Sequence, residues 1–327
     1  MSPQLSSREI FKRAERAYRT SSSCRLCPRR CRVDRTAGET GYCKAGPQPA
    51  IAAAVPHFGE EPPLTGPGGA GTVFFTRCNL CCIYCQNFQI SQGPCEESIT
   101  PQRLSEQMLL LQEQGCWNLE LVSPTHHLPG SLEALAMAVD KGLKVPVVYN
   151  SNAYEAPETV DLLEGIVDVY LPDLKYASNE HASRLSDVAD YVQTARSAIV
   201  RMHEQVGNLV LDLHGRAVKG LILRHLVLPG DLSGTRETLL WLHDNLPHTV
   251  TISLMAQYGP RHRSAAFPPL NRRVTFDEYE NAVDLAWKLG FENVFIQDLE
   301  SQTVGIPDFD RTRPFEWDTE SGRGNPG

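Results

Sequence analysis

The sequence contains no apolar run of eighteen residues, the length that indicates a membrane-spanning helix. Residues 1–23 are polar and charged, so the apolar stretch of a secretory signal is missing as well. An excess of positive charge is also absent, since the net charge is −8, and this does not indicate a general nucleic-acid binder. We therefore expect a cytoplasmic protein without membrane or nucleic-acid partners.

Two common nucleotide-binding motifs are missing too. The chain has no phosphate-binding loop that ends in Gly-Lys-Ser or Gly-Lys-Thr. Its glycine-rich stretch at 66–71 precedes a predicted strand, whereas a dinucleotide fingerprint follows one.

Short apolar runs alternate with longer amphipathic stretches along most of the 327 residues. The runs predict strands at 72–76, 118–122, 145–149, 167–171, 221–226, 250–254 and 293–296, and the stretches predict helices that include 101–114, 131–141, 157–164, 234–244 and 275–289. This alternation predicts βαβ units and a parallel sheet. With about six βα units, we expect an α/β fold of the partial TIM barrel type, with its site at the carboxyl ends of the strands.

The chain divides into four predicted parts. Residues 1–23 are a leader with a short amphipathic helix at 10–18, and residues 24–61 are a small cysteine-rich metal module. Residues 62–299 form the barrel, and residues 300–327 are a polar tail that we expect to be mobile. Three aromatic residues of the tail are candidates to dock on the barrel: Phe309, Phe315 and Trp317.

Ten cysteines need an explanation, because disulfides are disfavoured in a reducing cytoplasm. Eight of them form two groups, at 24–43 and 78–85, while Cys95 and Cys116 stand alone. We interpret the single cysteines as small buried hydrophobic residues and the groups as metal-binding or catalytic.

The later group follows a predicted strand and has the spacing C-x3-C-x2-C at Cys78, Cys82 and Cys85. Three thiolates can hold a four-iron cluster and leave one iron open for chemistry, whereas four would close it. We therefore predict a catalytic [4Fe–4S] cluster on these three residues. Two alternatives remain: a ligand set of Cys78, Cys81 and Cys85, and a closed zinc site in which Cys81 is the fourth ligand.

The earlier group has the spacing C-x2-C-x3-C-x11-C at Cys24, Cys27, Cys31 and Cys43. Four thiolates at short spacing suit a closed structural site, and both zinc and an auxiliary iron–sulfur cluster fit it. Two disulfides or free thiols are the alternative, which a reducing compartment disfavours.

The cysteine loop has an aromatic residue, Tyr84, before its last cysteine, and in this it resembles the signature of the radical SAM superfamily. The resemblance implies that S-adenosylmethionine (SAM) binds the open iron through its amino and carboxylate groups. It also implies that one electron from a flavodoxin- or ferredoxin-like donor cleaves SAM to methionine and a 5′-deoxyadenosyl radical, which abstracts hydrogen from a substrate. Tyr84 then lies near the adenine.

From Cys24 to about Gln297, the chain resembles radical SAM proteins that are similar to pyruvate formate-lyase activating enzymes. The phrases that carry this likeness are both cysteine groups and the stretches 121–126, 147–152, 170–176 and 224–230. The likeness implies activation of a glycyl-radical enzyme as partner, by removal of a hydrogen from a backbone glycine. One phrase departs: activating enzymes usually carry a Gly-Gly-Glu-type contact to the SAM amino group where this chain has Ser123-Pro124-Thr125-His126. The Thr125 hydroxyl or a backbone carbonyl is then the expected acceptor.

Polar residues that follow the third and fourth strands are further candidates for the SAM site. Asp173 and Lys175 form an Asp-Leu-Lys phrase that activating enzymes also carry, which implies contact with SAM or the target backbone; a salt bridge is the alternative. Asn150 and Ser151 stand where the family places polar groups near the methionyl moiety, although turn capping also explains them.

Candidates from other strands complete the predicted site. Arg224 and His225 interrupt an apolar strand, and alternation lets only one of them face the barrel, where it would bind the SAM carboxylate or ribose. A structural pair is the alternative. His126 and His127 follow the second strand, and one of them is predicted to line the pocket, with His126 as the candidate. Gln257 and Tyr258 follow the sixth strand and are expected to meet the substrate.

Two other functions remain open. The same fold suits hydrogen abstraction from a metabolite or from another type of protein residue. A non-catalytic zinc scaffold is a third hypothesis, which metal analysis separates from the first two.

Overall fold

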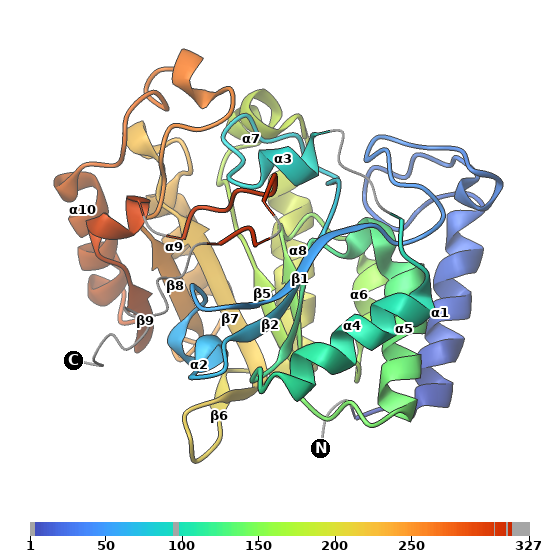
Figure 1. The fold of residues 1–327 in the computed structure, drawn as a ribbon. Helices are drawn as coiled ribbons and strands as arrows, with labels where there is room; N and C mark the ends of the chain where they lie inside the picture. The colour runs from blue at the N-terminus through green and yellow to red at the C-terminus, as the bar shows by residue number, and fades with distance from the viewer. Residues whose placement is uncertain (1–3, 94–97, 304, 312, 316–327) are drawn as a thin grey trace.

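The computed structural model describes residues 4–93, 98–303, 305–311 and 313–315. Its centre is a curved sheet with helices packed around the outside (Figure 1). The parallel strands are β2 (Ala70–Phe75), β3 (Leu119–Val122), β4 (Val147–Ser151), β5 (Val169–Pro172), β7 (Ala217–Leu226), β8 (Thr251–Met255) and β9 (Asn293–Ile296). These strands lie side by side in chain order, which is the arrangement expected of successive βα units.

Two further strands are antiparallel. β1 (Ile51–His57) pairs with β2 at one end of the sheet, and the short β6 (Val210–Leu211) pairs with β7 in a hairpin. Because β1 and β9 are the two ends of the strand order in the described part of the chain, the barrel is open. The expected α/β fold of the partial TIM barrel type is therefore confirmed.

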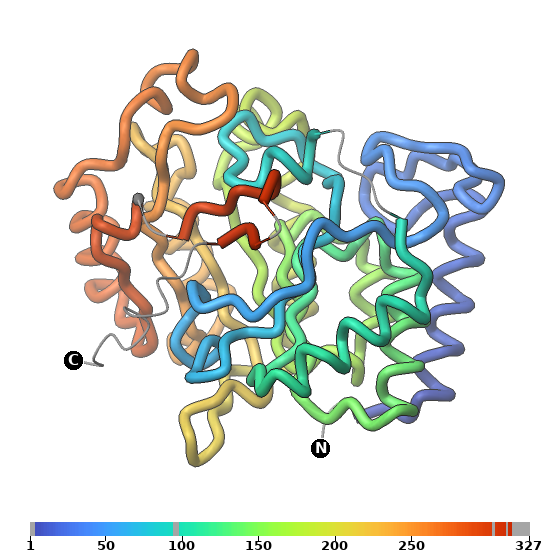
Figure 2. The backbone as a smooth tube through the Cα atoms, viewed as in Figure 1, coloured from blue at the N-terminus to red at the C-terminus, as the bar shows by residue number. Residues whose placement is uncertain are grey.

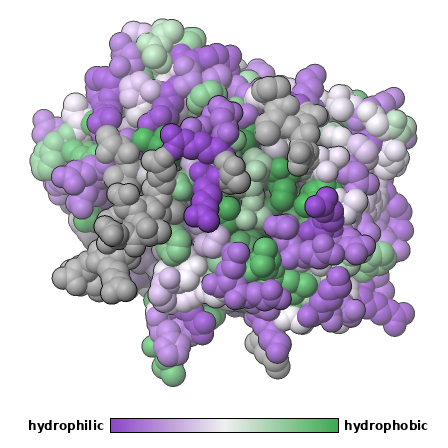
Figure 3. Space-filling view, viewed as in Figure 1, coloured by the Kyte–Doolittle hydropathy of each residue, from purple (hydrophilic) through white to green (hydrophobic). Residues whose placement is uncertain are grey.

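The helices of the described residues are α1 (Ser7–Ser21), α2 (Pro62–Thr65), α3 (Phe88–Ser91), α4 (Pro101–Glu113), α5 (Leu128–Asp140), α6 (Pro157–Leu163), α7 (Asn179–Ser186), α8 (Tyr191–Val206), α9 (Thr235–Asn245) and α10 (Phe276–Lys288). The five helices predicted for the barrel overlap α4, α5, α6, α9 and α10 of these ten described helices. Among the described residues, no helix is both long and apolar enough to cross a lipid bilayer. Figure 3 shows a face on which hydrophilic side chains predominate.

Helix α1 lies against the outside of α5 (Figures 1 and 2). Ile10, Ala14 and Ala17 are buried, and their spacing places them on one face of the helix. The Tyr18 hydroxyl donates a hydrogen bond to Glu133 of α5 at 2.7 Å. The leader is thus part of the packed molecule.

The chain between α1 and β1 has little regular structure apart from a 3₁₀ turn at Arg35–Ala37. β1 lies inside the predicted module 24–61, yet its pairing with β2 makes it part of the main sheet. The predicted module thus includes a strand of the main sheet. Pro56 is tolerated in β1 because an edge strand has one side without a ladder partner.

The predicted mobile tail is in part a docked segment. Phe309 and Phe315 both pack on Phe74 of β2. The Phe74 ring centroid lies 5.4 Å from that of Phe309 and 5.3 Å from that of Phe315. The segment crosses the open face of the barrel in front of the sheet (Figure 2). Aromatic burial fixes residues 305–311 and 313–315, whereas Trp317 lies outside the described residues.

Replacement of Ile10 tests whether α1 contributes to the stability of the barrel. Ile10 is fully buried, so Ile10→Ala should lower the free energy of unfolding by about 2–4 kcal/mol, measured by urea denaturation. Phe11→Ala is the matched control, since Phe11 is 42% exposed and its loss should change stability by less than about 0.5 kcal/mol. Equal effects of the two variants would contradict the packing of α1 on α5.

Candidate active site

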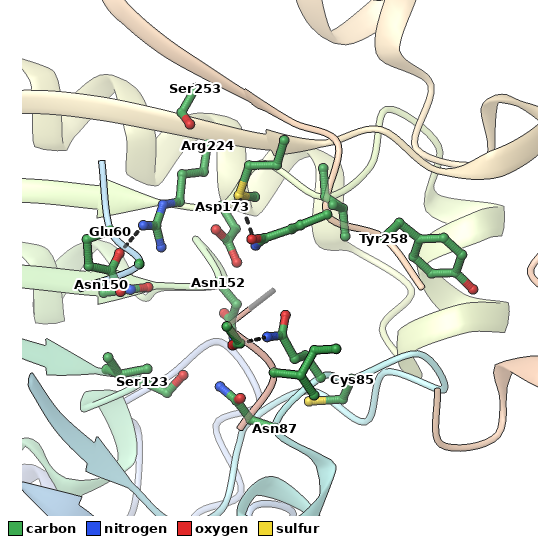
Figure 4. A pocket seen from close by; sticks show the side chains of 18 of the residues that line it. Glu60, Cys85, Asn87, Ser123, Asn150, Asn152, Asp173, Arg224, Ser253 and Tyr258 are labelled. Atoms are coloured by element: carbon green, nitrogen blue, oxygen red, sulfur yellow. Dashed lines mark hydrogen bonds and ion pairs between the residues drawn. The ribbon is translucent and has the colours of Figure 1, made fainter. Parts of the chain in front are cut away.

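A cavity of about 530 Å³ opens at the carboxyl ends of the parallel strands. Its size lies in the range of small-molecule sites. Figure 4 shows side chains from several strands that point into it. The predicted site residues that line it are Cys78, Cys82, Cys85, Tyr84, Asn150, Ser151, Asp173, Lys175, Arg224, Gln257 and Tyr258.

The cysteine loop begins directly after β2 and is tied to the neighbouring helix α7. Arg77, the residue before Cys78, has a positive φ of 70°, which turns the chain out of the strand direction. The backbone N–H of Cys81 donates to Ser186 O at 3.1 Å, and that of Ile83 donates to Leu185 O at 2.9 Å. These bonds fix the loop at the mouth of the barrel.

Two of the three predicted ligand sulfurs accept hydrogen bonds from protein donors. The Leu80 N–H and the Asn152 Nδ2 each donate to Cys78 Sγ at 3.4 Å. The Ser186 hydroxyl donates to Cys82 Sγ at 2.9 Å. Sulfur accepts hydrogen bonds weakly when neutral and more strongly when charged, so these donors suit thiolates.

The protonation of the three thiols depends on burial and on Lys175. Burial raises the pKa of Cys78 to about 12 and that of Cys82 to about 11, and it also raises the pKa of Cys85. The positive charge of Lys175 acts in the opposite direction on all three. A bound metal would further favour deprotonation of the three thiols, because cysteine ligands bind metals as thiolates.

Cys81 has hydrogen-bond partners that do not line the cavity. Its Sγ donates to Gln92 Oε1 at 3.1 Å, and Arg263 Nη2 donates to that sulfur at 3.4 Å. Cys81 is also absent from the described lining of the cavity. This geometry favours Cys78, Cys82 and Cys85 as the ligand set over either alternative that uses Cys81.

Asp173 and Lys175 form an ion pair at the cavity wall, with 2.6 Å between Nζ and Oδ2. Burial disfavours the charge on Lys175, but Asp173 and Cys82 outweigh it and raise the pKa of the lysine. Lys175 therefore remains positive beside the cysteines. The salt bridge and a role at the site are not exclusive, because both side chains still line the cavity.

Tyr84 and Asn150 both line the cavity. The Tyr84 ring meets Tyr176 and Tyr258 edge to face, at centroid distances of 6.4 and 6.1 Å, which holds it in place. Asn150 Nδ2 donates to Glu120 Oε1 at 2.7 Å. Each residue is thus held by protein neighbours and still faces the cavity.

A largely buried charge cluster, which the sequence did not predict, lies near the strand ends. Arg224 of β7 bonds Glu61 through two nitrogens at 2.6 and 2.8 Å and also pairs with Glu60 (Figure 4). Although burial opposes it, Arg224 together with His57 lowers the pKa of Glu60 to about 2. Glu120 is different, because burial and the charge of Glu60 raise its pKa well above the usual value. An acidic residue inside the apolar run 118–122 was the available signal for this cluster.

Three predicted cofactor contacts do not fit this geometry, because their side chains have other buried partners. The Thr125 hydroxyl donates to Glu155 Oε1 at 2.6 Å, and His126 Nε2 bonds Thr76 O at 2.8 Å. His225 bonds Leu174 O at 2.7 Å and Thr235 Oγ1 at 2.9 Å. None of the three is among the described residues that line the large cavity.

In the two segments that hold these candidates, a neighbouring side chain lines the cavity: Ser123 in one and the predicted Arg224 in the other. In the 123–126 segment, Ser123, which was not a predicted contact, lines the cavity, and its positive φ of 55° marks the sharp turn that carries Thr125 and His126 away. In β7, alternation turns Arg224 inward and His225 outward, as the sequence pattern requires of one of them.

The other cysteine group is collected elsewhere. Cys24, Cys27, Cys31 and Cys43 line a second, much smaller cavity, which His126 also lines. The structure therefore brings together the four residues that the spacing predicts. Cys116 is buried, as expected for an unliganded cysteine, whereas Cys95 lies outside the described residues.

Comparison with known proteins gives one family match and one curated relative. A family model described as the radical SAM superfamily matches residues 72–231. An uncharacterised protein of Methanocaldococcus jannaschii is 33% identical over 292 residues, which cover 86% of this chain and 80% of that protein.

Two solved structures are similar at low identity. A crystal structure of HydG, a maturase of the [FeFe]-hydrogenase, is 16% identical with a TM-score of 0.46 over 67% of this chain. A crystal structure of Streptococcus suis SuiB bound to precursor peptide SuiA is 13% identical with a TM-score of 0.47 over 68% of this chain. The chain spans about half the length of each, 49% and 47%.

The outward position of His225 predicts a pH dependence of stability. Burial lowers its pKa from 6.5 to about 4. Below pH 6.5 the unfolded chain gains a proton at this residue, while the folded chain stays neutral until about pH 4, so stability falls as the pH falls through this window. His225→Gln should reduce the loss between pH 7 and 4 by about 3 kcal/mol, measured by urea denaturation at each pH.

The matched control is His214→Gln, because His214 is exposed on the β6–β7 hairpin. It should leave the pH dependence of stability close to that of the unsubstituted protein. An unchanged pH dependence in His225→Gln would show that His225 is not held neutral by its surroundings.

Proposed function

The chain belongs to the radical SAM superfamily, and from that premise we propose that it cleaves SAM at a [4Fe–4S] cluster held by Cys78, Cys82 and Cys85. One observation carries this proposal: these three sulfurs line the 530 Å³ cavity, while Cys81 is bonded outside it. Three ligands suit a cluster with one open iron.

The donor set fits an iron–sulfur cluster. Donors from the loop itself, from the segment after β4 and from the end of α7 reach Cys78 and Cys82, and Ser91 lies 3.3 Å from Cys85 Sγ. Hydrogen bonds to ligand sulfur stabilise negative charge there and tune a cluster's reduction potential. When bound, the cluster and SAM supply one-electron cleavage of the sulfonium and a radical that removes a hydrogen atom from a substrate.

The rest of the cavity suits the charged and polar parts of SAM. Lys175 is a cation suited to its carboxylate, and Ser123 and Asn150 offer oxygen acceptors for its ammonium group. Tyr84 supplies an aromatic face of the kind that lies near an adenine. Asp173 holds Lys175 in place through their ion pair.

The hydrogen donor is proposed only as a class. The likeness to activating enzymes favours a glycyl-radical enzyme as the target, and a metabolite or another protein residue is the alternative. Ser123 stands where activating enzymes carry the Gly-Gly-Glu-type segment. Its contact with SAM would be the same for either class of target. A flavodoxin- or ferredoxin-like electron donor and a cytoplasmic location remain predictions.

Alanine variants of the loop test the ligand set. Anaerobically reconstituted protein given dithionite and SAM should release 5′-deoxyadenosine, measured by chromatography, and Cys82→Ala should abolish the release because the cluster loses one of three ligands. Cys81→Ala should retain most of it, since this sulfur has other partners.

Cys116→Ala is the control for loss of a buried cysteine outside both groups. Loss of 5′-deoxyadenosine release in Cys81→Ala with retention in Cys82→Ala would overturn the ligand assignment. Zinc in place of iron at this site in the native protein would overturn the enzymatic function itself.

Deuterium transfer identifies the class of target. A glycyl-radical enzyme labelled at its glycine Cα should transfer deuterium into 5′-deoxyadenosine, and the mixture should show a glycyl radical by electron paramagnetic resonance. Transfer from a labelled small-molecule pool, without a glycyl signal, would contradict the activating role and retain SAM cleavage.

A further inference from the structure

The small cavity lined by Cys24, Cys27, Cys31 and Cys43 has features of a built metal site. Its volume of about 10 Å³ is close to the space of one water-sized sphere, far less than the 530 Å³ beside the other cysteines. Such a space suits a single ion better than a four-iron cluster.

The backbone of this module is arranged to place donors on the cysteine sulfurs. The Tyr42 N–H donates to Cys31 Sγ at 3.3 Å. Gly41 makes this approach feasible, because a Cβ at that position would lie 2.8 Å from Cys31 Sγ. A larger residue at 41 would therefore require the Cys31 side chain or the neighbouring backbone to shift.

A buried cation lies beside the four cysteines. Arg35 is 3% exposed and lines the cavity, and its Nη2 donates to Gly46 O. Its Nε and Nη1 have no hydrogen-bond partner in the described part of the chain. Buried charge is costly unless it is paired, so Arg35 requires negative charge in this cavity, and thiolates bound to a metal would supply it.

His126 adds a nitrogen donor from the barrel side. Its Nε2 bonds the Thr76 carbonyl, which can only accept, so Nε2 carries the proton in the neutral ring. Nδ1 then has a free lone pair and finds no hydrogen-bond partner among the residues described here. A histidine whose other nitrogen donates to a backbone carbonyl is the usual arrangement of a metal ligand.

We propose that four of the five side chains Cys24, Cys27, Cys31, Cys43 and His126 hold a single zinc ion, and that His126 is one of the four. Zinc prefers four sulfur or nitrogen ligands in a tetrahedron, and His126 makes a set with both donor types available. In their present positions, no three His, Cys, Asp or Glu side chains of the described residues converge on one point. Zinc binding therefore requires rotation of the cysteine side chains toward one another.

The ion would join the N-terminal module to the cysteine loop of the barrel. The bond from His126 reaches Thr76, two residues before Cys78. On the other side, Arg29 Nε donates to Asn79 O at 3.0 Å, one residue after Cys78. These two hydrogen bonds lie on either side of Cys78, so loss of the zinc ion should make the position of Cys78 less fixed. The role of Cys78 as a cluster ligand rests on the proposed function, whereas the zinc site does not.

Metal analysis of the native full-length protein tests the site. Protein purified without chelators should contain about one zinc per chain, measured by mass spectrometry. The double variant Cys24→Ser/Cys27→Ser leaves three of the five donors and should lose the zinc, while Cys116→Ala should keep it. Absence of zinc, or iron and sulfide at this site in a variant that lacks Cys78, Cys82 and Cys85, would overturn the proposal.

Cobalt substitution tests the part of His126. The Co²⁺ form should show tetrahedral absorption with thiolate charge-transfer bands, and His126→Ala should shift the bands and weaken cobalt binding by about tenfold or more. His127→Ala is the matched control, because His127 bonds the same Thr76 carbonyl but is not among the described residues lining the cavity. Identical spectra for His126→Ala and the unsubstituted protein would overturn ligation by His126.

A chelator experiment needs no variant and is independent of SAM cleavage. Removal of zinc from the unsubstituted protein should lower its melting temperature, and added zinc should restore it. A melting temperature that does not change with zinc would contradict the proposed link between module and barrel. If 5′-deoxyadenosine is never released but zinc is present and stabilising, only the proposed function fails.

Discussion

Hydrogen bonds to the sulfurs of the cysteine loop connect distant parts of the chain at one point. Donors to Cys78 and Cys82 come from the loop, from Asn152 after β4 and from Ser186 at the end of α7. Burial raises the pKa of these thiols, so the loop can hold negative charge only with such donors, Lys175 and a metal together. A cluster can therefore be held only when the end of β4, the end of α7 and the cysteine loop are correctly placed relative to one another.

The far wall of the cavity is held by charge. Arg224 binds Glu61 and Glu60, which belong to the segment between β1 and α2. Removal of one member of a buried ion pair is expensive because the other is left unpaired. This cluster thereby anchors the β1–α2 segment over the strand ends, opposite the cysteine loop (Figure 4).

Much of the framework follows from the sequence pattern. Each of the seven predicted strand runs overlaps an observed parallel strand, because buried parallel strands are short apolar runs between helices. The spacing of the cysteines identified both groups, and the predicted polar residues at the end of β4 and after β5 do line the cavity. Each of these features depends on residues that are close together in the sequence, so a local sequence pattern is enough to predict it.

The direction in which a side chain points after a turn is harder to predict from the sequence. Thr125 and His126 follow β3 as a site residue should, but the turn at Ser123 carries them outward. The distinction between Cys81 and Cys82 depends on which of two adjacent sulfurs meets Gln92, ten or more residues away. The pairing of Glu60 and Glu61 with Arg224 joins residues more than 160 positions apart, which no local pattern reveals.

The central claim is that three cysteines hold a cluster with one iron open to SAM. Electron paramagnetic resonance of the reduced, reconstituted protein tests it most directly, before any product is measured. A SAM molecule that binds the open iron should change the signal of the reduced cluster, and the change should be absent without SAM. A reduced-cluster signal that is identical with and without saturating SAM would contradict the account.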